Sequence, residues 1–557
     1  MARKQTRKKN SIVIYIISMA AAVGLGVASW LAFNTVTGLN IIPQKYTDIM
    51  MYVLIGINAL FGLIAIIPGV SNLNKILQTV ISAALAVGLI YGNTVIPQYM
   101  GQFERMFNKV PEEGTLLMSV YTLKDSEIQD VEDLENVSVG VLAKKDADYL
   151  DYSYKVISRE LNGEQIVPVE YEDIYLLGED LLSGKIKAAL MNQTYAQFIS
   201  ENSDFESFPQ DTQVIYTIEH KIQLNYQSNA VGNITQEPFI IAVSGNDTWD
   251  YREMNPSNLT RSDVNMLVVV NPLTKKALIV SVPRDTYVPL WGDYDAMDKL
   301  THATIYGMDT WEQTLNSLLE TDINYFVRIN FQSLVNVIDA LGGIEIDNPY
   351  EMTIAFNTFD RETGRLGGET HTFEEGRIHI TGNQALGYVR ERKSLRNGDV
   401  DRVKHQAVVL KGIIDKVTQV SVITKVTDLL KAVEGTFITD LNTDQIYALV
   451  QMQLDDMASW TLASTTITGY GDMRTSYAMG SGDYEVEEEV EVEVPVVDEE
   501  GNPVYDEEGN QLIEIVTETQ TVTHEAQTYA VFIPDEASVQ NAINAINEIM
   551  NERPVEQ

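Results

Sequence analysis

The chain has 557 residues, no cysteine, and 79 Asp and Glu against 39 Lys and Arg, which gives a formal net charge of -40. Such an acidic chain repels the phosphate backbone, which argues against a general nucleic-acid binder. The lack of cysteine excludes disulfides, thiol nucleophiles and thiolate metal sites. Any metal would therefore be bound by oxygen or, less readily with only six histidines, by imidazole.

Three apolar runs near the N-terminus predict membrane helices near residues 11–34, 49–69 and 76–97, because each is long enough to cross a bilayer. A cleaved signal peptide is the alternative for the first run, but two more runs follow and no small-residue cleavage site is present. Residues 1–10 carry five Lys or Arg and form a basic tail. The positive-inside rule places this tail in the cytoplasm and everything after about Gln98 outside the cell membrane.

Residues 114–237 alternate short β-rich runs with helical runs, the pattern of a small α/β domain. The layout loosely resembles one lobe of a solute-binding protein. The segment contains no convergent set of charged residues, so we expect an accessory domain with a structural or docking role.

Residues 238–550 contain four apolar runs of strand length, 239–247, 264–270, 277–283 and 324–329, with helical patterns between them. Near-continuous apolar strands indicate a central sheet buried on both faces, so we expect an α/β fold with helices covering each face. Charged residues flank three of these strands at neighbouring ends: Asp247, Arg261, Asp263, Arg284 and Asp285. Strand ends of an α/β sheet are where ligand sites usually form.

The most cationic stretch of this acidic chain is GYVRERKSLRNGDVDRVKHQ, residues 387–406. Its pattern predicts a helix capped by Thr381, then an extended segment that places Arg390 and Arg392 on one side. A second helix is expected near Asp399 or Asp401, with Arg402 and Gln406 four residues apart on one face. Arginine is favoured over lysine for bidentate phosphate recognition. The alternative is a basic, solvated helix face.

The segment 484–525 carries fifteen Asp or Glu and no Lys or Arg, and DEEGN occurs twice in it. Alternating Glu and Val followed by Gly-Asn turns predict an inserted acidic β-hairpin. Disorder is the alternative at this charge density.

Four blocks of the second domain resemble, in order, the signature blocks of the LytR-CpsA-Psr family. They are RSDVNMLVVVNPLTKKALIVSVPRDTYV at 261–288, DKLTHATIYG at 298–307, FQSLVNVIDALGGIEID at 331–347, and QALGYVRERKSLRNGDVDRVKHQAVVLKGII at 384–414. The three membrane helices and the accessory domain resemble the capsule-associated branch of that family. The resemblance implies a central mixed sheet covered by helices on both faces.

The resemblance also implies an activity: transfer of a glycopolymer, such as a capsular polysaccharide or a teichoic acid, from an undecaprenyl-pyrophosphate carrier to peptidoglycan, outside the membrane and with magnesium. The positions that match the family's pyrophosphate-binding residues are Arg261, Arg284, Lys299, Arg390, Arg392, Arg402 and Gln406. Asp247 and Asp263 match its magnesium-binding positions, and Asp250 lies close enough to Asp247 to make that assignment the less secure of the two. Arg284, Arg390 and Arg392 are also the expected catalytic arginines.

Asp399 lies between the paired arginines and Arg402, and it is the carboxylate best placed in sequence to accept the proton of an attacking hydroxyl. Orienting Arg402 or capping the second helix is the structural alternative for this residue. Two other functions stay open: a non-enzymatic membrane regulator of polymer synthesis, and a hydrolase that transfers the lipid pyrophosphate to water.

Overall fold

The computed structural model describes most of the chain, and all structural statements below concern the residues that it describes. These are residues 2–38, 42–68, 70–106, 113–201, 205–223, 229–246, 260–292, 296–359, 366–392, 394–396, 398–419, 437–478, 484–497, 503–505, 511–524 and 528–554.

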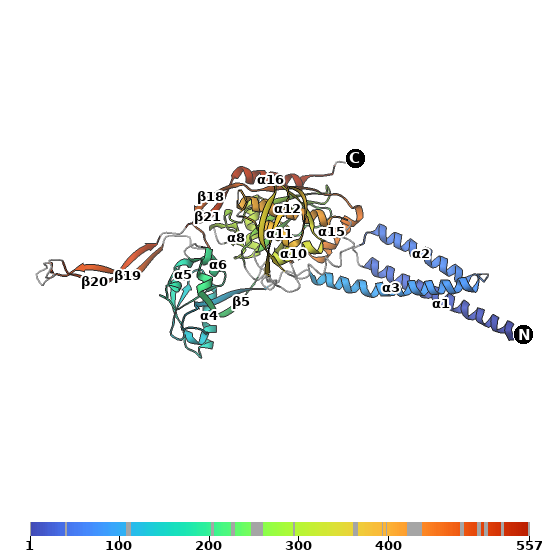
Figure 1. Ribbon diagram of the computed structural model, residues 1–557, viewed down its shortest axis with the longest axis horizontal. Coiled ribbons are helices and arrows are strands. Elements are labelled where there is room, and N and C mark those ends of the chain that lie inside the picture. The colour runs from blue at the N-terminus through green and yellow to red at the C-terminus, as the bar shows by residue number, and fades with distance from the viewer. Residues whose placement is uncertain are drawn as a thin grey trace.

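Three long N-terminal helices form a bundle that extends away from the rest of the molecule (Figure 1). They are α1 (Ala2–Gly38), α2 (Gln44–Ile66) and α3 (Asn72–Met106). Each contains a stretch that is long and apolar enough to cross a membrane, namely Ile12–Gly38, Gln44–Ile66 and Asn72–Pro97. Polar groups join the helices inside the bundle, where Asn58 donates to the Ser29 hydroxyl (2.8 Å). The prediction of three membrane-length helices is therefore confirmed.

A five-stranded mixed sheet organises the accessory domain, in the order β3-β2-β4-β1-β5. Strand β2 runs parallel to β3 and β4, whereas β1 is antiparallel to β4 and β5. The strands are β1 (Glu113–Leu123), β2 (Ser138–Leu142), β3 (Val167–Tyr171), β4 (Ala188–Asn192) and β5 (Thr212–Gln223). Around them lie η1 (Val131–Leu134), α4 (Ala147–Glu160), α5 (Ile174–Leu182), α6 (Tyr195–Glu201) and α7 (Phe208–Asp211).

A six-stranded mixed sheet forms the centre of the second domain, in the order β16-β11-β6-β7-β8-β17. Strands β6 and β11 are parallel, as are β8 and β17, and the remaining pairs are antiparallel. The strands are β6 (Phe239–Asn246), β7 (Val264–Asn271), β8 (Lys276–Val282), β11 (Tyr325–Asn330), β16 (Phe437–Thr439) and β17 (Thr461–Thr466).

Both faces of this sheet are buried, which explains why its strands are apolar at successive positions. Leu267 and Val280 pack on one face with Trp311 of α9 (Met308–Leu319) and Ile546 of α16 (Glu536–Asn551). On the other face, alternate residues of the same strands pack against Ala407 of α12 (Asp399–Val417). The expected α/β fold with helices on each face is therefore confirmed.

A second group of helices and strands lies between β11 and α12 in the chain. It consists of α10 (Phe331–Ala340), β12 (Ile344–Asn348) paired with β15 (Gly376–Ile380), β13 (Met352–Phe359) paired with β14 (Leu366–Phe373), and α11 (Gly382–Arg390). As predicted, Thr381 caps α11, because its hydroxyl accepts from the Gln384 amide while the Gln384 side chain accepts from the Thr381 amide. The apolar side chains of these helices and strands form a separate core that includes Phe373, Leu386 and Tyr388.

The remaining elements connect the sheet to the accessory domain and the C-terminus. They are β9 (Tyr287–Pro289), β10 (Met297–Lys299), α8 (Leu300–Ala303), α15 (Thr443–Asp456), β18 (Gly469–Arg474) and β21 (Tyr529–Pro534). The acidic segment forms an antiparallel pair, β19 (Tyr484–Pro495) with β20 (Ile513–His524), so the predicted hairpin is confirmed. This hairpin projects away from both domains (Figure 1).

Candidate active site

A small cavity of about 150 Å³ lies where four strands of the central sheet end or begin. Strands β6, β8 and β11 end at this edge and the antiparallel strand β7 begins there, while α10, α11 and α12 close it from above. The wall consists of Gly245, Asn246, Asp263, Val264, Arg284, Ile329, Asn330, Phe331, Leu334, Val389, Arg390, Arg402 and Gln406. Three arginines and one aspartate therefore face a cavity whose remaining wall is largely apolar.

An ion pair between Arg284 and Asp263 joins two neighbouring strands at the cavity. Arg284 Nη1 donates to Asp263 Oδ1 at 2.7 Å, and their side chains are only 22% and 16% exposed. Burial alone would raise the pKa of Asp263, but the guanidinium groups of Arg284, Arg261 and Arg402 outweigh it and hold the pKa below its usual value. Asp263 is therefore a carboxylate at neutral pH.

The other two arginines reach the cavity from the helices. Arg390 is the last residue of α11, and its guanidinium lies over the Phe331 ring, 4.3 Å from the centroid. Arg402 and Gln406 both lie on α12 and both line the cavity, as their spacing of four residues predicts. The cavity thus presents planar, forked cations, which suit the paired oxygens of phosphate groups.

Arg261 and Lys299 lie beside the cavity but do not line it. Burial lowers the pKa of Arg261, and both Asp263 and Arg284 are among the charges that act on it. Burial likewise lowers the pKa of Lys299, which is close enough to Asp285, Arg284 and Arg261 to feel their charges. Both residues therefore add positive potential behind Arg284.

The predicted extended Arg-Glu-Arg segment is wrong at its first residue, because the helix continues through Arg390 and the extended backbone begins at Glu391. The packing of the Arg390 guanidinium on Phe331 is a physical reason for this extra helical residue. Arg392 is exposed and does not line the cavity. Asp247 and Asp250 lie outside the described residues, as does the side chain of Asp399, although Asp399 is the first residue of α12 and follows Gly398 at the N-cap.

The wall residues that the sequence prediction missed include two asparagines, Asn246 and Asn330, and the aromatic Phe331. Asn246 and Asn330 are direct neighbours in the parallel register of β6 and β11, and each ends its strand at the cavity. A polar residue that ends an apolar strand is the sequence signal for both asparagines, although neither carries a charge. Both asparagines are 2% exposed, and neither Asn246 Oδ1 nor Asn330 Nδ2 has a hydrogen-bond partner among the described residues.

The same wall offers oxygen atoms to a hard cation. Within the described residues, no group of three or more His, Asp or Glu gathers in a way that could hold a metal. Asp263 and Asn246 nevertheless line one cavity, and Asn246 Oδ1 has no hydrogen-bond partner among the described residues. Carboxylate and amide oxygens are protein ligands that magnesium accepts. The donor set fits a cation that completes its coordination with phosphate oxygens.

A second, larger cavity of about 470 Å³ shares Arg390 with the first. The β13–β14 hairpin and α11 form it, and its wall combines Phe356 with polar side chains that include Asn357, Glu369 and Glu391. An aromatic ring among amide and carboxylate groups suits a sugar, which presents both hydroxyls and apolar faces.

Several comparisons relate the chain to known proteins. Over 222 residues it is 33% identical to the polyisoprenyl-teichoic acid–peptidoglycan teichoic acid transferase TagU of Bacillus licheniformis, covering 40% of this chain and 66% of that protein. It is 35% identical over 216 residues to TagU of Enterococcus faecalis, covering 38% and 64%. The chain thus spans slightly less than two thirds of the length of these relatives.

Solved structures with similar folds include TagU of B. subtilis, with 23% identity and a TM-score of 0.36, matched over 58% of this chain and 100% of that chain. Another is TagT bound to LI-WTA, with 19% identity and a TM-score of 0.38, matched over 59% and 100%.

The family comparison covers all six strands of the central sheet and the whole cationic cavity. The model of the LytR_cpsA_psr family matches residues 206–491, which is just over half of the 557 residues. The chain therefore belongs to the LytR-CpsA-Psr family.

Proposed function

We propose that this protein is a membrane-anchored phosphotransferase that moves a glycopolymer from a polyprenyl-pyrophosphate carrier to peptidoglycan on the outer side of the cell membrane. The observation that carries the proposal is the cavity that Arg284, Arg390 and Arg402 line together with Asp263. Three guanidinium groups against one carboxylate leave an excess of positive charge in a small, partly apolar space. A diphosphate bearing a lipid chain complements both properties.

The relatives named TagU support the same reaction class, since their name describes transfer of a polyisoprenyl-linked teichoic acid to peptidoglycan. Whether the polymer here is a teichoic acid or a capsular polysaccharide depends on sugar contacts. The larger cavity beside Arg390 is the proposed place for the saccharide next to the reacting phosphate.

In the proposed reaction a hydroxyl oxygen of peptidoglycan attacks the phosphorus next to the polymer. A new oxygen–phosphorus bond forms, the bond to the carrier phosphate breaks, and polyprenyl phosphate leaves. Arg284, Arg390 and Arg402 hold the diphosphate and stabilise charge on its oxygens, while Gln406 contributes an amide. Arg261 and Lys299 raise the local positive potential, and Asp399 accepts the hydroxyl proton.

We propose Asp263 and Asp247 as the protein ligands of magnesium, with Asn246 Oδ1 as an added ligand. Bound magnesium would neutralise diphosphate charge and help to align the two phosphates. The ion pair between Arg284 and Asp263 keeps this carboxylate ionised and ready to bind a cation.

The test is a transfer assay with the full-length protein, a synthetic polyprenyl-pyrophosphate-linked saccharide and peptidoglycan fragments, with and without magnesium. The proposal expects saccharide attached to peptidoglycan through a phosphodiester, and release of polyprenyl phosphate only when acceptor is present. Release without acceptor would instead support the hydrolase. No release under any condition would support the non-enzymatic regulator.

A further inference from the structure

The hydrophobic core of the accessory domain continues into the second domain. This core, which includes Phe198 and Tyr175, also contains Ile305 and Ala478 of the second domain. Tyr175 stacks on Tyr529 with ring centroids 5.4 Å apart. The two domains therefore share buried apolar surface immediately beside the residues that flank the cavity.

Phe198 of α6 makes the most direct contact with the site. The Arg261 guanidinium lies over the Phe198 ring, 5.8 Å from its centroid, and the same ring lies 4.7 Å from the ring of His302. Phe198 is fully buried in a close-packed core. The ring therefore restricts the positions that the Arg261 and His302 side chains can adopt against it. A ring of the accessory domain thus fixes one side of Arg261, while Arg284 and Asp263 act on it from the cavity side.

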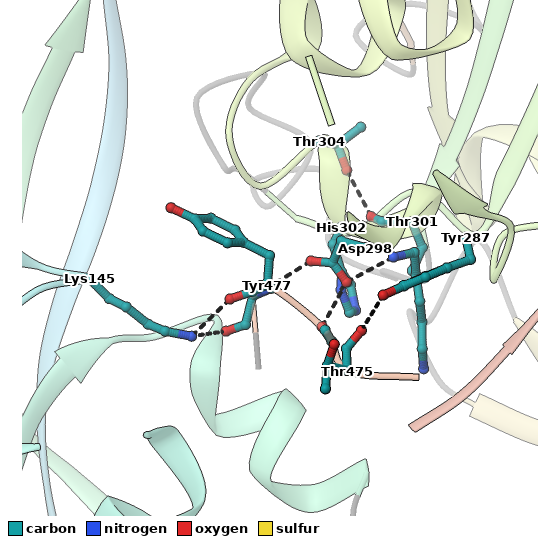
Figure 2. Close-up of polar contacts among 11 residues, drawn as sticks. Lys145, Tyr287, Asp298, Thr301, His302, Thr304, Thr475 and Tyr477 are labelled. Carbon is teal, nitrogen blue, oxygen red and sulfur yellow. Dashed lines mark hydrogen bonds and ion pairs between the residues drawn. The ribbon is translucent and has the colours of Figure 1, made fainter. Parts of the chain in front are cut away.

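A second connection runs through Lys145 and the segment 475–478, which Figure 2 shows in close-up. Lys145 Nζ donates to the carbonyl oxygens of Tyr477 (3.1 Å) and Ala478 (2.6 Å). From the same segment, the Ser476 hydroxyl (2.6 Å) and the Ala478 amide (2.9 Å) donate to the carboxylate of Asp298. Lys145 therefore holds in place the segment that donates hydrogen bonds to the Asp298 carboxylate.

Hydrogen bonds connect Asp298, through helix α8, to the backbone beside the cavity. The carboxylate is fully buried, and it also accepts from His302 Nδ1 (2.8 Å) and from the Lys299 amide (2.8 Å), which fixes the start of α8. In that helix the Thr301 amide donates to the Arg284 carbonyl (2.8 Å), and the Thr301 carbonyl accepts from the Ser262 amide (3.1 Å). The backbones of Arg284 and Ser262, which frame the ion pair, thus depend on the Asp298 network.

We infer that the accessory domain is part of the diphosphate site, in which Phe198 and Lys145 are positioning residues: Phe198 orients Arg261, and Lys145 anchors the Asp298 network behind Arg284. The inference rests on the proposed function and assigns to the accessory domain a role in holding the phosphate-binding residues. A small displacement of a phosphate-binding side chain removes much of its contribution to binding. Losing the contact of Phe198 or of Lys145 should therefore weaken diphosphate binding.

The experiment measures binding of geranylgeranyl pyrophosphate to the full-length protein in detergent. Phe198→Leu keeps most of the buried volume but removes the ring, and it should weaken binding about 10-fold. The matched control is Phe208→Leu, because Phe208 is equally buried in the same core and packs on Tyr121 instead. The control should lower the melting temperature similarly and change binding less than about twofold. Equal losses of binding in the two variants would overturn the inference.

A double-mutant cycle with Arg261→Ala separates positioning from general destabilisation. If Phe198 acts through Arg261, Phe198→Leu should cause no further loss of binding in the Arg261→Ala protein. A full additional loss would contradict the positioning role.

Lys145→Met should also weaken binding about 10-fold, because the stem remains but the bonds to 475–478 are lost. Lys144→Met is the control, since Lys144 is exposed and pairs with Glu172 within the accessory domain. Equal binding by the two lysine variants would remove Lys145 from the network. The binding measurement does not require transfer. A wild-type protein that binds the probe but transfers nothing would contradict the proposed function, and the same variants would still test this inference.

Discussion

The ion pair between Arg284 and Asp263 sets the chemical character of the cavity. Unpaired, a mostly buried carboxylate would tend to take up a proton, and three arginines without an anion would repel one another. Together they leave a site that stays charged and ordered while keeping guanidinium groups directed at an incoming diphosphate. The pair therefore keeps the site organised before the substrate arrives.

The structure distinguishes the two arginines that the sequence had paired. Arg390 lines the cavity and Arg392 does not, so Arg390→Lys should lower the transfer rate at least 10-fold, because a point charge cannot replace the guanidinium fork or its packing on Phe331. Arg392→Lys is the matched control and should cost much less. Steady-state transfer rates, with melting temperatures to check folding, measure both. Equal rates for the Arg390 variant and wild type would show that Arg390 does not hold the diphosphate.

Asp399 is the residue whose predicted role calls for a direct kinetic test. Asp399→Asn keeps the side-chain shape at the start of α12 but cannot accept a proton, so a base role predicts unchanged binding of the lipid substrate and transfer reduced on the order of 10²-fold. Single-turnover transfer together with lipid binding separates the two effects. Wild-type turnover would leave Asp399 with only a structural role.

At the scale of elements, the sequence predicted what depends on local pattern. The apolar runs became β6, β7, β8 and β11, and the Thr381 cap began α11. The register of β6 on β11, which brings Asn246 beside Asn330, depends on pairing between segments more than eighty residues apart. No local period encodes that neighbour relation, so the sequence shows that each asparagine ends an apolar strand but not that the two meet at one cavity.

The start of helix α4 carries a pH-dependent contribution to stability. Burial raises the pKa of Asp146 to about 7, despite hydrogen bonds from Asn192 and Tyr195 and the charge of Lys145. Between about pH 4 and pH 7 the folded protein holds a proton at Asp146 that the unfolded chain has released. The free energy of unfolding therefore falls as the pH rises through this range, by up to about 1.4 kcal/mol per pH unit.

Asp146→Asn should remove this dependence and raise the stability of the accessory domain at pH 8. Hydrogen exchange at the amides of β2, measured between pH 4 and pH 8 in the full-length protein and corrected for intrinsic rates, reports the local stability. Asp148→Asn is the control, because Asp148 lies exposed in the first turn of the same helix. A similar pH profile in wild type and Asp146→Asn would contradict the assignment.

At the scale of the whole molecule, the apolar helices, the central sheet and the accessory domain have separate roles in the proposed reaction. The three apolar helices are long enough to anchor the chain in a membrane, the central sheet carries the cationic cavity, and the accessory domain packs beside Arg261. The projecting β19–β20 hairpin pairs only with itself among the described strands, so it adds no strand to the sheet that bears the cavity. The proposed transfer to peptidoglycan requires that this cavity lies on the outer side of the membrane.

The orientation of the chain is the last prediction. Five Lys or Arg precede the first apolar helix, so the positive-inside rule places the N-terminus in the cytoplasm, and three crossings place both domains outside. Protease added to intact protoplasts should destroy a C-terminal epitope and spare an N-terminal one, while permeabilised protoplasts should lose both. An N-terminal epitope lost from intact protoplasts, with the C-terminal one protected, would reverse the topology. The site would then face the cytoplasm, away from the peptidoglycan that the proposed reaction requires.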